Sequence, residues 1–259
     1  RTGRCGIIVV PYSLMNSNLT LLLIFLVPLF HTPLRAQDHV YDDLLVMYVD
    51  EDYEKCIWKA GRYMEKDDTR RDALPYLYAS MCYHEMSKMD KYTADPEYKN
   101  AHRDALKYAV KFRKKDKNNE FVNNYEDYWT ELNTTAMGAG LAHLDLGEYS
   151  KAKREFDRMT GYQPENAGAW QMLAIAQLKM RLARDAAESM KAFHEAYAAI
   201  PDISRLPVDQ KRILRESLIR YADHLAEAGM RDSARTVVGL GEDYFSENPE
   251  YKALVKDLN

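Results

Sequence analysis

The chain has 259 residues, which is enough for one large domain or two small ones. Its 46% hydrophobic and 29% charged residues are typical of a globular protein and exclude a disordered chain, which would have too few apolar residues to form a core. With 11 Gly and 9 Pro, the sequence is neither collagen-like nor rich in the turns that an all-β fold needs.

The net charge of −4 is distributed unevenly along the chain. Residues 1–37 hold three Arg and no Asp or Glu, so residues 38–259 carry 33 basic against 40 acidic side chains, or −7. Nucleic acids are bound mainly through Lys and Arg contacts to phosphates. We therefore expect no nucleic-acid partner.

Residues 19–30 form an apolar stretch, LTLLLIFLVPLF. The stretch is shorter than the roughly 20 residues that span a bilayer, and its length is typical of a secretory signal peptide. With Met15 as the start and Ala36 near the cleavage site, we predict a signal peptide over residues 15–37, an upstream extension before it, and an exported protein in the periplasm or cell envelope. A retained anchor and a cytosolic protein are the alternatives, because the apolar stretch has no Lys or Arg before it from Met15 onward.

Two cysteines, Cys56 and Cys82, follow the predicted signal peptide. An oxidising compartment would allow a disulfide between them. The simpler interpretation is two buried free thiols on helices, because cysteine packs well in a core. Their spacing fits no zinc-binding pattern, and the sequence leaves the pairing open.

From residue 38 onward, apolar residues recur every three or four positions, as on one face of an α-helix. Gly and Pro separate these segments, for example in residues 160–164 and 199–201. We predict an all-α domain over residues 38–259.

Two consecutive blocks of this domain, residues 133–166 and 167–200, are each 34 residues long and have small and large residues at matching positions. A third block fits residues 215–248, and a short helix over 250–258 would follow it. The residues that carry the pattern are Gly140, Gly147, Tyr149, Ala152, Phe156 and Pro164 in the first block, Trp170, Leu173, Ala174 and Ala186 in the second, and Leu218, Tyr221, Ala222, Gly229 and Ala234 in the third.

This pattern resembles the tetratricopeptide repeat (TPR) family, whose unit is a 34-residue helix–turn–helix. The resemblance implies a right-handed α-solenoid of about four to five TPR-like hairpins with a C-terminal capping helix. Small residues such as Gly140 and Ala152 would let the two helices of a hairpin approach, and large ones such as Phe156 would fill the gaps.

The first half of the domain shows weaker matches. We predict a second helix of a hairpin around Tyr53, Cys56, Ala60 and Tyr63, and a first helix around Tyr76–Tyr83. Its partner would be residues 97–115 with Ala105, Ala109 and Phe112 facing inward, after a longer connection at 87–96. Residues 121–146 are expected to form one long helix, and residues 201–214 a spacer.

Few residues suggest chemistry. His84-Glu85 and His194-Glu195 begin like a zinc-protease helix, but each lacks the second His four residues after the first. We interpret both as exposed His–Glu pairs on helices. The sequence has no phosphate-binding loop and no nucleophile elbow. We therefore predict no enzymatic activity, no metal and no cofactor.

The TPR resemblance further implies a concave surface lined by the first helix of each hairpin. Burial by a neighbouring helix is the alternative for several positions. Placed on the three clear blocks, this surface gives a candidate groove for a partner, formed by Met137, Leu141, Asp145, Gln171, Ile175, Lys179, Ile219, Asp223 and Glu227.

These observations predict an exported scaffold that mediates protein–protein interaction in a cell-envelope assembly, secretion or motility complex. Its partners would be other proteins, bound by the groove or by the Tyr-rich N-terminal half. The alternative is a helical-repeat module that binds a peptide or glycan. Membrane contact would be at most peripheral, because the one basic run, Lys111–Lys115, also suits the C-terminus of a helix.

Overall fold

The computed structural model describes residues 39–259, and every regular element within them is a helix. Thirteen α-helices and two short 3-10 helices cover 75% of these residues, with no strand among them, which confirms the predicted all-α class. The predicted signal peptide at 15–37 and the extension before it lie outside the described residues. Among the described helices, none is long and apolar enough to span a bilayer.

The N-terminal half contains the helices predicted there. Ala105, Ala109 and Phe112 are completely buried, as expected, and the long connection at 87–96 contains one short helix. The helices are α1 (Asp42–Val49), α2 (Tyr53–Glu65), α3 (Leu74–Met86), α4 (Asp90–Thr93) and α5 (Ala101–Lys115).

The C-terminal half contains longer helices in pairs, and its last helix matches the predicted cap. The elements are η1 (Val122–Asn124), α6 (Glu126–Asp145), α7 (Tyr149–Tyr162), α8 (Ala167–Lys179), α9 (Ala183–Ala198), η2 (Ile203–Arg205), α10 (Val208–Glu227), α11 (Arg231–Gly239), α12 (Glu242–Phe245) and α13 (Pro249–Leu258).

The expected single helix over residues 121–146 was wrong, because the chain forms a separate 3-10 turn before α6. The carboxylate of Asp116 causes this break. It accepts hydrogen bonds from the backbone N–H groups of Glu120, Phe121 and Val122, which hold the chain in a turn.

The expected spacer at 201–214 was also wrong in its second half, which is the beginning of α10. Pro207 directly precedes this helix, where a missing N–H costs nothing, so the proline starts the helix and does not interrupt it. Ile213 and Leu214 are buried, and their burial ties this first part of α10 to the core.

Four hairpin turns share one backbone conformation. In the pairs α1/α2, α6/α7, α8/α9 and α10/α11, one residue of the turn has a positive φ between 58° and 78°. The residue after it donates a backbone hydrogen bond to the carbonyl five residues earlier, as in the Schellman motif. Gly147 and Gly229 occupy two of these positions, whereas Glu51 and Arg181 occupy the other two.

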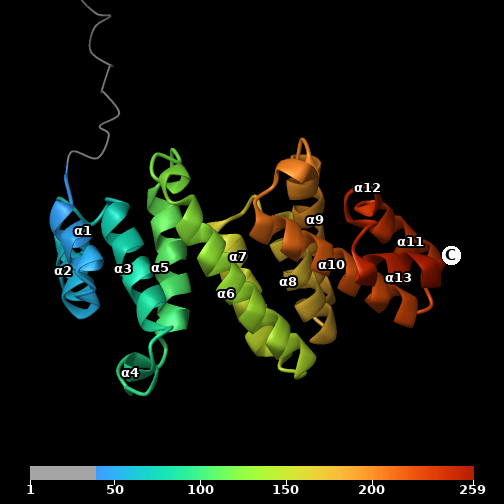
Figure 1. Ribbon diagram of the computed structural model, residues 1–259, viewed down its shortest axis with the longest axis horizontal. Coiled ribbons are helices and arrows are strands. Elements are labelled where there is room, and N and C mark those ends of the chain that lie inside the picture. The colour runs from blue at the N-terminus through green and yellow to red at the C-terminus, as the bar shows by residue number, and fades with distance from the viewer. Residues whose placement is uncertain (1–38) are drawn as a thin grey trace, which may run out of the picture. The chain divides into compact units, whose positions relative to one another are not determined.

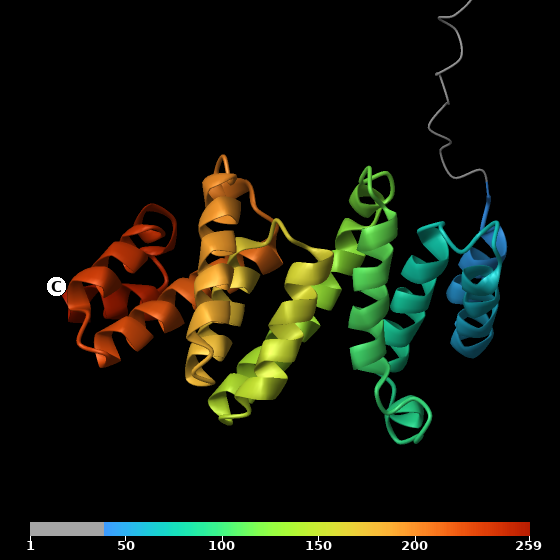
Figure 2. The same cartoon turned by 180° about the vertical axis from the view of Figure 1, so that it is seen from behind.

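Each helix packs chiefly against helices near it in sequence, and the helices follow one another in chain order (Figure 1). Helices α6 and α10 lie towards the viewer in Figure 1, whereas α7 and α9 do so in the opposite view of Figure 2. Helix α10 packs on α6 as well as on α8. It therefore covers parts of two earlier helices.

A buried polar network joins α6, α7 and α10. The Asn133 side-chain amide donates to Asp209 Oδ2 and to Gln163 Oε1, both at 2.6 Å, and its oxygen accepts from the Tyr162 hydroxyl at 2.8 Å. All four residues are at most 7% exposed. A buried carboxylate such as that of Asp209 is costly without its hydrogen-bond donors. Arrangements of the three helices that break these bonds are therefore disfavoured.

Two contacts show that α6 and α10 run in the same direction. Asn133, in the first half of α6, meets Asp209 at the beginning of α10, and Asp145 meets Arg220 twelve and eleven residues further along. A pair of antiparallel helices would reverse this order. The first helices of the two hairpins are therefore parallel.

Two glycines permit close approach between helices. A Cβ on Gly140 would lie 2.5 Å from the Phe156 ring, which confirms the expected packing of a small residue against a large one. A Cβ on Gly168 would lie 2.6 Å from the backbone nitrogen of Leu214. Backbone cannot move aside as a side chain can, so Gly168 fixes the distance between α8 and α10.

We predict that Gly168→Ala lowers the free energy of unfolding by about 1–3 kcal/mol, the range for overpacking a tight core. Gly138→Ala is the matched control, because Gly138 also lies in a helix but its Cβ would meet nothing within 4 Å. That substitution should raise stability by up to about 1 kcal/mol through helix propensity. Urea unfolding followed by circular dichroism measures both, and equal effects would contradict the prediction.

Candidate functional site

Two hollows are lined mainly by side chains of α1, α3, α6, α8 and α10. The C-terminal groove has a volume of about 220 Å³, and the N-terminal pocket has a volume of about 500 Å³. The groove is lined by Leu144, Tyr149, Ile175, Lys179, Arg220, Asp223, His224 and Glu227. The pocket is lined by Tyr48, Met81, Glu85, Asn123, Asn124, Tyr125, Glu126, Asp127, Tyr128 and Glu131.

The C-terminal groove brings together four residues of the predicted partner surface, Ile175, Lys179, Asp223 and Glu227. The parallel course of α8 and α10 accounts for this. Gln171 accepts a hydrogen bond from the Ser217 hydroxyl at 2.8 Å, and Lys179 meets Glu227 two turns further on. Side chains at matching positions of the two helices therefore converge.

Other predicted groove residues do not face solvent. Met137, Gln171 and Ile219 are at most 3% exposed, and Ile175 lies at the bottom of the groove with the same small exposure. The cause is helix α10, which packs over both α6 and α8. Leu141 is half-buried and Asp145 is exposed.

The charges of the C-terminal groove are largely paired with one another. Arg220 contacts the carboxylates of Asp145 and Glu216, and the Lys179 ammonium lies 3.6 Å from Glu227. Burial raises the pKa of Asp223, and the nearby Glu227 carboxylate adds to this effect. The groove is therefore close to electrically balanced.

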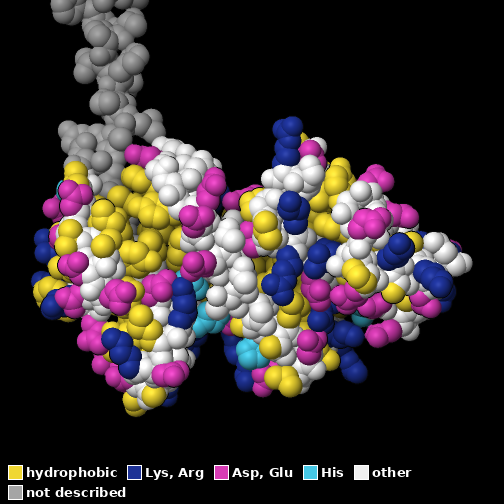
Figure 3. Space-filling view, in the orientation of Figure 1, with side chains coloured by type: hydrophobic (Ala, Val, Ile, Leu, Met, Phe, Trp, Pro, Cys, Tyr) yellow, Lys and Arg dark blue, Asp and Glu magenta, His cyan; other side chains and the backbone are white. Residues whose placement is uncertain are grey.

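The N-terminal pocket combines aromatic rings with carboxylates. Three tyrosines line it, together with Glu85, Glu126, Asp127 and Glu131. Figure 3 shows hydrophobic side chains with Asp and Glu around them on the part of the surface formed by α1, α3 and the start of α6. Lys88 is the cation that contacts two of these carboxylates. The pocket therefore carries a negative charge.

Three helices position the walls of this pocket. Helix α1 contributes Tyr48, α3 contributes Met81 and Glu85, and α6 contributes Tyr128 and Glu131. The Ser80 hydroxyl lies 2.6 Å from both the Tyr128 hydroxyl and the Ala105 carbonyl oxygen, which holds the ring of Tyr128 against α3 and α5. The wall is thus part of the core and keeps its shape.

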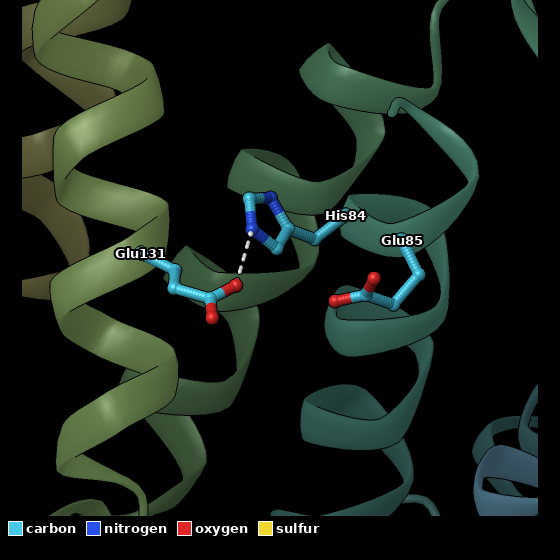
Figure 4. A group of neighbouring side chains, drawn as sticks. All are labelled: His84, Glu85 and Glu131. Atoms are coloured by element: carbon cyan, nitrogen blue, oxygen red, sulfur yellow. Dashed lines mark ion pairs between the residues drawn. The ribbon is translucent and has the colours of Figure 1, made fainter. Parts of the chain in front are cut away.

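His84 lies behind the pocket and is completely buried, which corrects the expectation of an exposed His–Glu pair on α3. Its Nε2 atom is 3.5 Å from Glu131 Oε2, and neither ring nitrogen makes a hydrogen bond (Figure 4). Burial lowers the pKa of His84 to about 4, and the neighbouring Lys88 ammonium acts in the same direction. His194 of the second predicted pair is exposed, as expected.

The Lys88 ammonium bridges two helices. It donates to Glu85 Oε1 at 2.8 Å, near the end of α3, and to Glu131 Oε2 at 2.9 Å on α6. The sequence shows that Glu85 and Lys88 are three residues apart, but it gives no sign that Glu131 meets them. This cluster was therefore missed by sequence analysis.

The two cysteines are free thiols in the structure, and both are completely buried on α2 and α3. The Cys56 thiol donates to the Leu44 carbonyl oxygen. A hydrogen bond with the Cys56 thiol, together with burial, raises the pKa of Cys82. A protonated and inaccessible thiol is a poor nucleophile, so the cysteines add no reactive group to the pocket.

Comparison with known protein families, curated proteins and solved structures finds no match to this chain.

We predict that the free energy of unfolding falls as the pH is lowered from 7 to 5. The folded state keeps His84 neutral down to a pKa of about 4, whereas the unfolded state takes up a proton near 6.5. The contribution of neutral His84 to the free energy of unfolding is therefore fully present above pH 6.5. It is lost as the pH falls towards 4, by at most about 3 kcal/mol for a shift of this size.

Urea unfolding in the presence of a chelator at pH 7, 6 and 5 measures this dependence. His84→Leu should remove most of the slope between pH 7 and 5, where the majority of carboxylates stay ionised. His194→Gln is the control, because that side chain is exposed, and it should leave the slope unchanged. A wild-type curve that is flat over this range would refute the prediction.

Proposed function

We propose that this protein is a scaffold of TPR-like helical hairpins that binds a basic segment of a partner protein in its N-terminal pocket. The single observation that carries this proposal is the composition of the pocket, in which three tyrosines and four carboxylates surround a hollow of about 500 Å³. Such a surface is complementary to Lys and Arg side chains, which pair with carboxylates and stack on aromatic rings.

The repeated turns support the solenoid part of the proposal. Four hairpins close with the same hydrogen-bond pattern, and the positive-φ residues Gly147 and Arg181 are separated by 34 residues, the length of a TPR unit. The parallel course of α6, α8 and α10 is expected if they are first helices of successive units. These features support the solenoid that we propose, which is right-handed by its resemblance to the TPR family and capped by α13.

The Lys88 ammonium supports the choice of a basic partner. It makes charged hydrogen bonds at 2.8 and 2.9 Å to Glu85 and Glu131, two of the carboxylates that line the pocket. A partner's Lys or Arg would find the same kind of environment beside Glu126 and Asp127, which are exposed. The net charge of −7 on residues 38–259 would also attract a basic segment over a distance.

The C-terminal groove would serve as a second and weaker contact, because its cations and carboxylates already pair with one another. The predicted signal peptide favours a location in the cell envelope, and we propose that the scaffold joins components of an assembly, secretion or motility complex there. The location rests on the sequence, and the role in a complex rests on the general use of helical-repeat proteins as docking surfaces.

A glycan is the second candidate ligand of the same pocket. Tyr48, Tyr125 and Tyr128 offer ring faces and hydroxyl groups, which suit the apolar faces and hydroxyls of sugars. The affinity for a glycan would depend little on salt concentration, whereas the affinity for a basic peptide would fall as salt is added.

Binding of fluorescein-labelled peptides tests the proposal. Peptides of twelve residues that are rich in Lys and Arg should bind the wild-type protein, whereas matched peptides with Glu in place of Lys and Arg should not. Glu126→Gln combined with Asp127→Asn removes two negative charges from the pocket and should weaken binding at least about fivefold, which corresponds to a loss of roughly 1 kcal/mol in binding free energy. Raising the salt concentration to 0.5 M should weaken wild-type binding in the same way.

Glu242→Gln combined with Asp243→Asn is the matched control. These two residues are also an exposed acidic pair in the first turn of a helix, α12, and they lie outside the pocket. The control should change affinity less than twofold. Equal losses in both double variants would show that only the net charge matters and would refute a specific pocket.

A further inference from the structure

The clustered side chains behind the N-terminal pocket have the composition of a metal site. His84 and Glu85 come from α3, and Glu131 comes from α6 (Figure 4). One nitrogen or oxygen from each lies within 4.8 Å of the other two. The group thus offers one imidazole and two carboxylates at a common point between two helices.

The ring nitrogens of His84 are free to act as ligands. Its side chain is completely buried, yet neither ring nitrogen makes a hydrogen bond within the described part of the chain. A buried polar group without a partner is costly. The Nε2 atom is directed at the Glu131 carboxylate, 3.5 Å away, so a group bound between them would satisfy this nitrogen.

The Lys88 ammonium shows that this position favours a cation. It is bound to both carboxylates of the cluster at 2.8 and 2.9 Å, and its side chain is 42% exposed. A long, half-exposed side chain can move into solvent at little cost. A divalent ion could then replace its single charge between the two carboxylates and use the imidazole as well.

We propose that His84 Nε2, Glu85 and Glu131 bind a divalent transition-metal ion of the zinc type, with Lys88 as the competing cation. Zinc accepts one nitrogen and two carboxylate oxygens, and a fourth position would be open to water from the pocket. The imidazole excludes magnesium and calcium as preferred ions, because they select oxygen ligands.

The geometry needs only small side-chain movements. Ligand atoms about 2 Å from a tetrahedral zinc ion lie roughly 3.3 Å apart, close to the distance between His84 and Glu131. Glu131 is 59% exposed and Glu85 is 23% exposed, so both can change rotamer. A bound ion would tie α3 to α6 and thereby stiffen the wall of the pocket.

Calorimetric titration of the metal-free protein with Zn²⁺ at pH 7 tests the site. One ion should bind per chain, and Mg²⁺ should bind at least about tenfold more weakly. Glu131→Gln and Glu85→Gln should each weaken Zn²⁺ binding about tenfold or more, a loss of about 1.4 kcal/mol. Both carboxylates reach solvent, so these variants keep the proposal testable even if His84→Gln fails to fold.

Lys88→Met provides the decisive variant, because it should tighten Zn²⁺ binding by removing the competing ammonium. A general loss of structure or of negative charge would not produce a gain. His143→Gln is the matched control, since His143 is hydrogen-bonded to Glu148 in a hairpin far along the sequence, and it should have no effect.

Three outcomes would overturn the proposal. They are the absence of stoichiometric Zn²⁺ binding in wild type and Lys88→Met, binding that Glu131→Gln leaves unchanged, and equal affinity for Mg²⁺. The site does not depend on the proposed peptide binding. Glu126→Gln with Asp127→Asn should leave the affinity for Zn²⁺ within about twofold, so that failure of either idea can be recognised separately.

Discussion

The side chain of Asn133 holds three helices in one arrangement. It is hydrogen-bonded to Asp209, Gln163 and Tyr162, and all of these groups are buried. Removing the amide would leave a carboxylate in the core without its closest donor, which is far more costly than losing an exposed contact. The network therefore fixes how α10 lies on α6. The position of α10 in turn decides which side chains of α6 and α8 remain open to a partner.

Two regions of the same surface differ in their electrostatic state. In the C-terminal groove, Arg220 and Lys179 balance the carboxylates around them. The N-terminal pocket is lined by four carboxylates, and the Lys88 ammonium contacts only two of them, Glu85 and Glu131. Unpaired carboxylates give the N-terminal pocket a negative potential, whereas the paired charges of the C-terminal groove largely cancel. The same imbalance underlies both the basic partner and the metal ion proposed above.

The helices could be predicted from the sequence because their signals are local. The spacing of Ala105, Ala109 and Phe112 alone identifies the buried face of α5, and all three are buried. Prediction of the candidate sites would have required the arrangement of the helices in space. Whether Ile219 is exposed depends on how α10 crosses two other helices, and the meeting of Glu131 with His84 depends on how α3 and α6 are rotated. Neither rotation nor crossing is encoded in the spacing of residues along one helix, so only the structure reveals them.

The hairpin turns have one more implication. The left-handed residue is Gly in two of them but Glu51 and Arg181 in the other two, while the backbone hydrogen bonds are the same in all four. The turn is thus specified by its hydrogen bonds, and glycine only makes it less costly. A helical array can lose its marker glycines one at a time and keep its architecture. Searches that rely on those markers will then count fewer hairpins than the molecule contains.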